Sequence, residues 1–235
     1  MSKKSTANGK SKTVADRVYV YVDDIGNHGK SPQGSGNRQF GFGVAVVKDP
    51  DKYSDVSAQY KKGKKIDGEF KAKEVKPLRE KLSLGHGIRK SGAKTYGYYV
   101  DKKKDTPDGW EQNGSKRQTG MLHKSLDLTL SKIGEKNVSV LIDQNTAYKN
   151  GKKVNEMSEL LSEKHDKDVE CKIWKDRDGE GKKLPPNPHM ETTDVVSHAI
   201  QERVEEHSPW MSLAMGQKLK RLDENESIKV EEWKR

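Results

Sequence analysis

The stretch Arg17-Val-Tyr-Val-Tyr-Val-Asp-Asp-Ile-Gly-Asn27 decides the fold, because it begins as a strand and ends in two carboxylates and a glycine. β-Branched and aromatic residues fill every position from Val18 to Val22, which favours a strand. A strand with no polar face suits the centre of a sheet that is covered on both sides. Ligands and metal ions gather at the carboxyl ends of strands in open α/β sheets, so Asp23 and Asp24 stand where a site is expected. An Asp-rich turn that only ends the strand explains the same residues.

The composition limits the classes of protein to which the chain can belong. Of its 235 residues, 30% are apolar and 35% are charged, and the formal net charge is +10. A basic excess favours a phosphate-rich partner, with nucleic acid first, although solubility alone also requires surface charge. The single Cys171 excludes an internal disulfide and a cysteine zinc cluster, and agrees with a cytoplasmic protein. No apolar run approaches ~18 residues, so we predict no membrane span.

Periodic apolar residues predict alternating strands and helices, which indicates an α/β fold with a mixed sheet. Further strands are predicted at residues 39–47, 94–100, 137–143 and 168–175, and helices at residues 121–133, 154–165, 191–207 and 210–222. A short strand at residues 57–60 and a helix at residues 69–84, kinked by Pro77, complete the assignment.

Four acids from separate predicted elements form the candidate site. Asp23 and Asp143 each end a strand, Asp194 lies in the first turns of a helix, and Glu69 follows Gly68. Hard divalent cations take such oxygen ligands, and two ions about 4 Å apart stabilise the attacking and leaving oxygens of phosphoryl transfer. Asp101, after the strand 94–100, is the alternative third acid.

The same acids lie in motifs that resemble those of domain-of-unknown-function family 3800. Tyr21-Val-Asp-Asp-Ile-Gly-Asn27 resembles its Tyr-Ile-Asp-Glu-Ser-Gly opening, and Gly68-Glu-Phe-Lys71 resembles its Glu-x-Lys element. Leu141-Ile-Asp143 is similar to its strand-ending Asp, and Met190-Glu-Thr-Thr-Asp-Val-Val196 to its Leu-Gln-x-Ala-Asp-Leu-Val helix start. The order and spacing agree over roughly residues 17 to 207.

This resemblance implies an RNase H-like fold with a carboxylate metal site and nuclease activity. It implies that Asp23, Glu69, Asp143 and Asp194 hold Mg²⁺ or Mn²⁺, with Asp24 as a neighbour and Lys71 on the substrate phosphate. We accordingly expect a flexible basic arm (1–15), an RNase H-like domain (16–208), and a C-terminal helix with a charged tail (209–235). The expected partner is nucleic acid, without a membrane, and the oligomeric state stays open.

The chain also departs from the family pattern. Asp24 stands where the family has Glu, Ile25 replaces Ser, Glu191 replaces Gln, and Thr193 replaces Ala. These changes leave room for a rival interpretation, in which an RNase H-like module binds nucleic acid or protein without catalysis. A structural or assembly protein is the third alternative.

Three further features have both a functional and an ordinary interpretation. His198 lies four residues after Asp194 and is either an accessory ligand or proton carrier, or a surface histidine. The lysines at 61–65 either follow a phosphate backbone or form a solvated face. Trp174 either stacks on a base or packs at the rim of the core.

Overall fold

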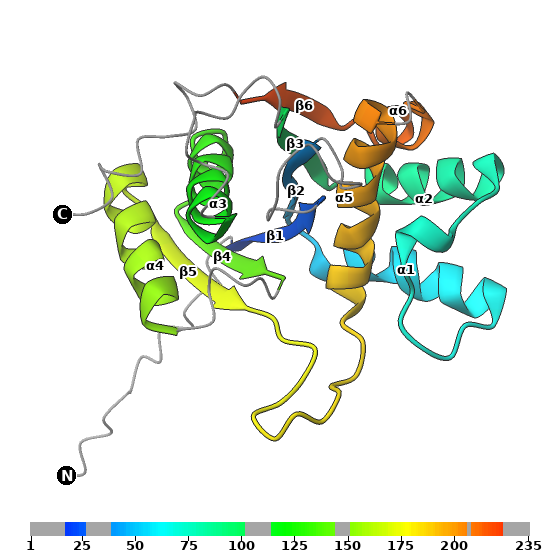
Figure 1. Cartoon of the computed structure of the whole chain (residues 1–235), viewed down its shortest axis with the longest axis horizontal. Helices are drawn as coiled ribbons and strands as arrows, with labels where there is room; N and C mark the ends of the chain where they lie inside the picture. Colours follow the sequence, from blue (N-terminus) through cyan, green and yellow to red (C-terminus); the bar gives the residue numbers. More distant parts are fainter. Residues whose placement is uncertain (1–16, 27–38, 102–113, 144–150, 206–207, 223–235) are drawn as a thin grey trace, which may run out of the picture.

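The computed structural model describes residues 17–26, 39–101, 114–143, 151–205 and 208–222 (Figure 1). The predicted basic arm (1–15) and the tail from residue 223 onward lie outside the described residues. Among the described helices, none has the length and apolar composition needed to cross a membrane.

Six strands form one mixed sheet in the order β5-β4-β1-β2-β3-β6. Strand β2 is antiparallel to both of its neighbours, and the other adjacent pairs are parallel. Strands β1, β3, β4 and β5 therefore end at the same edge of the sheet. The strands span β1 Arg17–Ile25, β2 Gln39–Val47, β3 Lys94–Asp101, β4 Asn137–Ile142, β5 Asp168–Ile173 and β6 Lys218–Arg221.

Helices cover both faces of the sheet, which confirms the predicted α/β class and is compatible with an RNase H-like fold (Figure 1). Helices α3 (Gly114–Leu130) and α4 (Gly151–His165) lie on one face. The opposite face carries α1 Pro50–Lys64, the short 3-10 turn η1 Ala72–Glu74, α2 Leu78–Lys90, α5 Pro188–Glu205 and α6 Trp210–Met215.

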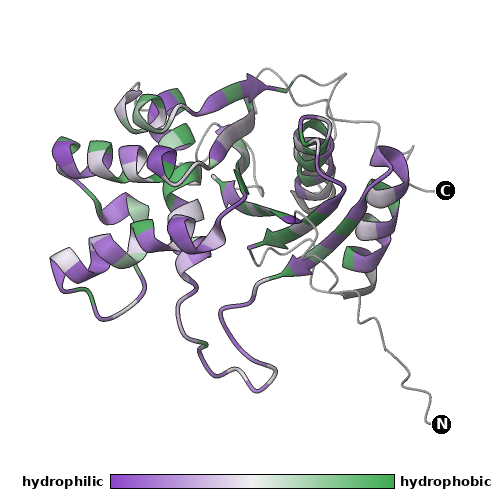
Figure 2. Ribbon diagram, turned by 180° about the vertical axis from the view of Figure 1, so that it is seen from behind, coloured by the Kyte–Doolittle hydropathy of each residue, from purple (hydrophilic) through white to green (hydrophobic). Residues whose placement is uncertain are grey.

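Strand β1 contributes to the cores on both faces, as predicted for a central strand. Val18, Val20 and Val22 pack in the core beneath α3 and α4. Tyr21, and Tyr19 in part, pack toward α5 on the other side. Figure 2 shows the hydrophobic residues of the strands in the interior and hydrophilic residues on the helices around them. Side chains alternate along a strand, so Asp23 continues the Tyr19 and Tyr21 face, toward α5.

The predicted strand at residues 57–60 is wrong, because these residues lie within helix α1. Only Tyr53 and Ser57 of this helix are buried, so its sequence shows little of the apolar periodicity that predicts a helix. Its start has clear local causes: the Asp49 side chain accepts a 3.1 Å hydrogen bond from the Lys52 N–H, and Pro50 follows.

The predicted helix at residues 69–84 is also wrong in its bounds. Glu69 lies outside any helix, in the segment before η1, and α2 begins after Pro77. Helix α2 continues through Gly85 to Lys90. A Cβ at Gly85 would lie 2.8 Å from the Met211 carbonyl oxygen, so the glycine lets α6 pack directly on α2.

The predicted helix at residues 210–222 stops halfway. Gly216 adopts a left-handed conformation (φ 68°) and ends α6 after Met215. The following residues form β6, which pairs in parallel with β3 and so extends the sheet.

Candidate functional site

Asp23 and Asp143 lie at equivalent positions on neighbouring parallel strands. The register pairs Val22 of β1 with Ile142 of β4, and the Asp143 N–H donates a 2.9 Å hydrogen bond to the Val22 carbonyl. Leu141, like Tyr21, packs on the α5 side, so alternation turns both aspartates toward α5. The predicted convergence of these two acids is therefore present.

Helix α5 places Asp194 against the same edge. Its Oδ2 accepts a 2.7 Å hydrogen bond from the Ala72 N–H. One turn later, the Ser197 hydroxyl donates to the Asp23 carbonyl at 3.2 Å. Helix α5 is thus joined both to β1 and to the segment that carries Glu69.

A pocket of about 260 Å³ brings the predicted acids together. Six of its eleven lining residues are acidic, and two are lysines. The lining residues are Asp23, Asp24, Glu69, Lys71, Lys73, Asp143, Trp174, Asn187, Met190, Glu191 and Asp194. All four predicted metal ligands, together with Asp24 and Lys71, therefore share one cavity.

Asp23 is the most buried of these four acids, with 7% of its surface exposed. Burial raises its pKa well above the ordinary value, and the charges of Asp194, Asp143 and Asp24 raise it further. Its Oδ1 accepts a 2.9 Å hydrogen bond from the Asp24 N–H. A cation beside Asp23 would favour its charged form and reverse this effect.

Asp194 also has a raised pKa, chiefly because it is buried. The Ala72 N–H and the charges of Lys71 and His198 act in the opposite direction, while Glu69 raises it further. Asp194 is therefore an electrostatic neighbour of both Asp23 and Glu69.

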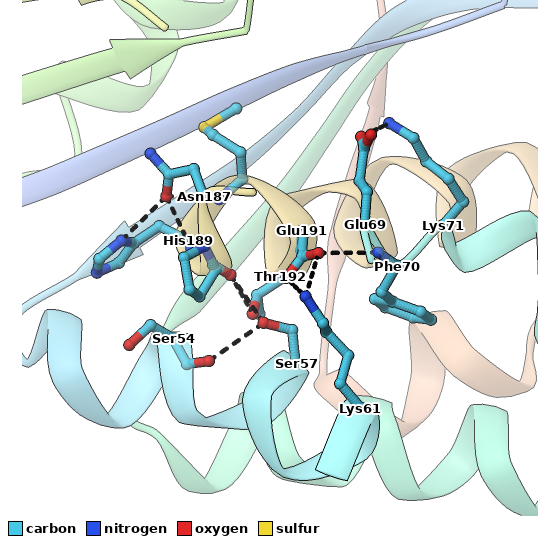
Figure 3. Close-up of polar contacts among 12 residues, drawn as sticks. Ser54, Ser57, Lys61, Glu69, Phe70, Lys71, Asn187, His189, Glu191 and Thr192 are labelled. Carbon is cyan, nitrogen blue, oxygen red and sulfur yellow. Dashed lines mark hydrogen bonds and ion pairs between the residues drawn. The ribbon is translucent and has the colours of Figure 1, made fainter. Parts of the chain in front are cut away.

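Glu69 has a different environment, since it pairs with two lysines. Lys71 lies 2.5 Å from Oε1, and Lys183 lies 3.3 Å from Oε2. Burial alone would raise the pKa of Glu69, but the two lysines lower it below its ordinary value. Glu69 is thus held as a carboxylate at the pocket wall, with Lys71 beside it (Figure 3).

Asp24 faces the other side of the sheet, where α3 lies. The side-chain N–H of Gln118 donates a 3.2 Å hydrogen bond to its Oδ2. Asp24 lines the pocket, yet its carboxylate is held from the side opposite α5.

Asp101 and His198 lie outside the pocket lining. Asp101 is buried at the end of β3, and β2 separates that strand from β1. Of the two alternatives for the third acid, Asp143 is the one that shares a pocket with Asp23. His198 Nε2 lies 3.3 Å from Glu202 Oε1, further along α5.

Sequence reasoning gave no role to several residues of the pocket, chiefly Glu191, Asn187 and Lys73. The sequence does contain a feature that indicates Glu191. It precedes Asp194 by three residues, and that spacing places both acids on one face of α5. Trp174 also lines the pocket, one strand beyond Asp143, where its N–H donates to the Ile142 carbonyl at 2.8 Å.

Within the part of the chain that the structure describes, no three His, Cys, Asp or Glu side chains have the arrangement of a formed metal site. Glu69 and Asp194 bond instead to ammonium and N–H donors of the chain itself. The chemistry of the donor set nevertheless suits a hard cation, because several carboxylates line one small cavity. No model of a known protein family matches the chain, and neither does any curated protein.

Proposed function

We propose that the protein is a metal-dependent nuclease that hydrolyses phosphodiester bonds. The observation that carries this proposal is the shared pocket, in which acids from β1, the end of β4, α5 and the segment before η1 meet. Separate chain segments seldom direct so many carboxylates into one cavity for stability alone, because their charges repel. The proposal includes membership of the family that the motifs resemble.

Asp23, Asp143 and Asp194 would hold Mg²⁺ or Mn²⁺, with Glu69 as the fourth acid. Bound there, the metal would supply an activated water and stabilise the leaving oxygen. The raised pKa of Asp23 and of Asp194 supports this assignment, because buried acids that repel one another gain most from a cation.

The substrate in this proposal is a nucleic acid, and the chain offers cations to bind it. Lys71 and Lys73 line the pocket next to the acids, and Lys183 reaches Glu69 from the segment before α5. An ammonium group beside the carboxylates would bind a substrate phosphate and orient it toward Asp23 and Asp143. The net charge of +10 favours the approach of a polyanion.

The rival proposal is a non-catalytic module that binds nucleic acid or protein. The pairing of Glu69 with both Lys71 and Lys183 favours it, because these ion pairs already neutralise one of the four acids. The two proposals differ in their need for a metal ion, so one experiment separates them.

The test is a cleavage assay with labelled single- and double-stranded DNA and RNA, in Mg²⁺, in Mn²⁺ and in chelator. We expect cleavage that chelator abolishes and that Asp23→Ala lowers by more than about a hundredfold, since even outer-sphere changes cost up to that much. Asp55→Ala removes an exposed acid of α1 and is the matched control. Cleavage that survives in folded Asp23→Ala would rule out the assigned site. Binding without cleavage would favour the rival.

A further inference from the structure

Residues 69–72 lie alongside the first turns of α5 and are bonded to them at two points, of which Figure 3 shows the one between Phe70 and Glu191. The Phe70 N–H donates to Glu191 Oε1 at 2.8 Å, and the Ala72 N–H donates to Asp194 Oδ2 at 2.7 Å. Lys71 between them has an extended backbone (φ −122°, ψ 126°). Two acids one helical turn apart therefore accept alternate N–H groups of an extended segment.

The register of this segment decides which side chains reach the pocket. Phe70 and Ala72 are each 1% exposed and belong to the core under α5. Side chains alternate in an extended chain, so Glu69 and Lys71 point the other way and line the pocket. A shift by one residue would exchange the two pairs, as it does in a strand.

Glu191 is more deeply buried than the four candidate metal ligands. It is 4% exposed, and the Lys61 ammonium lies 2.9 Å from Oε1 and 3.2 Å from Oε2. Oε1 thus accepts from both Lys61 and Phe70. The Glu191 carboxylate therefore connects Lys61 of α1 with the main chain of Phe70.

We propose that Glu191, held by Lys61, is a positioning residue that fixes the register of residues 69–72 and so keeps Glu69 and Lys71 in the pocket. The Lys61–Glu191 pair joins α1, α5 and this segment at one point. The expected effect of this positioning on metal binding rests on the proposed function. The position of the segment itself is tested without metal.

The test compares two double variants that both remove the ion pair. In Lys61→Met/Glu191→Met, apolar side chains of similar size replace the buried charges, an exchange that often leaves the stability unchanged. It removes the acceptor for the Phe70 N–H. Lys61→Met/Glu191→Gln retains an acceptor at the same place and is the matched control.

The first readout is amide hydrogen exchange at Phe70 and Ala72, with Val20 in β1 as the internal reference for global stability. We expect Phe70 to exchange about tenfold faster in the Met/Met variant, the effect of one lost hydrogen bond, and to stay protected in the Met/Gln variant. Equal protection of Phe70 in both variants would overturn the proposal, whatever the metal experiments show.

The second readout is the dissociation constant for Mn²⁺, measured by calorimetry on the same proteins. We expect the Met/Met variant to bind at least about tenfold more weakly than the Met/Gln variant, as for other outer-sphere changes. If the wild-type protein binds no Mn²⁺, the proposed function fails, and the amide exchange alone decides on the positioning role.

Discussion

The Ser197 hydroxyl on α5 donates a hydrogen bond to the main-chain carbonyl of Asp23, 3.2 Å away on β1. Gly43, directly opposite Asp23 on β2, makes this approach sterically feasible. A Cβ at position 43 would lie 2.3 Å from Ser197 Oγ and 2.7 Å from Ser197 Cα. Because Asp194 lies one turn before Ser197, the distance between α5 and the sheet also sets the distance between Asp194 and Asp23.

Gly43→Ala should therefore move α5 away from the sheet and separate the acids. Overpacking of this kind costs about 1–3 kcal/mol of the free energy of unfolding, which urea titration measures. Any stabilisation of the wild type by Mn²⁺ should shrink in this variant.

Gly63→Ala is the control, because nothing lies within 4 Å of the added Cβ in α1. We expect it to be neutral or to stabilise by up to ~1 kcal/mol, since alanine is the better helix former. If both variants unfold at the same urea concentration, Gly43 does not set the position of α5.

Asp143→Asn should raise the melting temperature in chelator. The charge of Asp143 contributes to the raised pKa of Asp23, so removing it relieves repulsion in the pocket. A relief of about 1 kcal/mol corresponds to roughly 2–4 °C for a domain of this size.

With millimolar Mn²⁺, the order of the two proteins should reverse. Bound metal stabilises the folded wild type by mass action, while Asp143→Asn loses a ligand. Asp55→Asn, at an exposed position, should behave as the wild type in both conditions. A wild type that is indifferent to Mn²⁺, with a variant that melts at the wild-type temperature in chelator, would contradict the proposed metal site.

The part of the site that the sequence predicts best is the part built by strands. Apolar runs that end in Asp predict acids at one edge of the sheet, and the parallel pairing of β1 with β4 places Asp23 beside Asp143 there. The resemblance of the motifs also predicted Asp194 and Glu69 as site residues, and both line the same pocket.

The parts that escaped prediction depend on tertiary packing. Helix α1 buries little more than Tyr53 and Ser57, so its period gave a weaker signal than its Asp49-Pro50 start. The extended backbone around Lys71 exists because acids on α5, some 120 residues later, accept its neighbours' N–H groups. No local pattern encodes such a partner.

Lys81 and Glu202 form a second buried ion pair, between α2 and α5, and this pair predicts a large single-variant effect. Glu202 is 1% exposed, and its Oε1 bonds to Lys81 and lies 3.3 Å from His198. Lys81→Met should cost about 3–5 kcal/mol, because it leaves a buried charge with one partner fewer. Adding Glu202→Leu should recover most of this loss in a double-mutant cycle.

Lys64→Met provides the comparison on the protein surface. Lys64 pairs with Glu80 with more of both side chains exposed, so its removal should cost no more than about 1 kcal/mol. If Lys81→Met costs as little as Lys64→Met, the Lys81–Glu202 pair is effectively solvated, and its burial does not determine its energy.

His123 predicts how the protein responds to acid. It lies on α3, only 8% exposed, and burial lowers its pKa to about 4. The unfolded chain binds the same proton near pH 6.5, so acid favours the unfolded chain. The free energy of unfolding is therefore unaffected by the protonation of His123 above pH 6.5, and it decreases progressively as the pH falls toward 4. At ~1.4 kcal/mol for each pH unit, the loss amounts to roughly 3 kcal/mol.

Urea unfolding of the wild type and of His123→Gln between pH 7 and pH 4 measures this contribution. The variant cannot take up the proton, so its free energy of unfolding should fall less steeply, whatever its value at pH 7. His86→Gln, at an exposed position of α2, should keep the wild-type slope. Parallel pH profiles for the wild type and His123→Gln would show that His123 becomes protonated within the folded protein at its ordinary pH, and that α3 opens to water there.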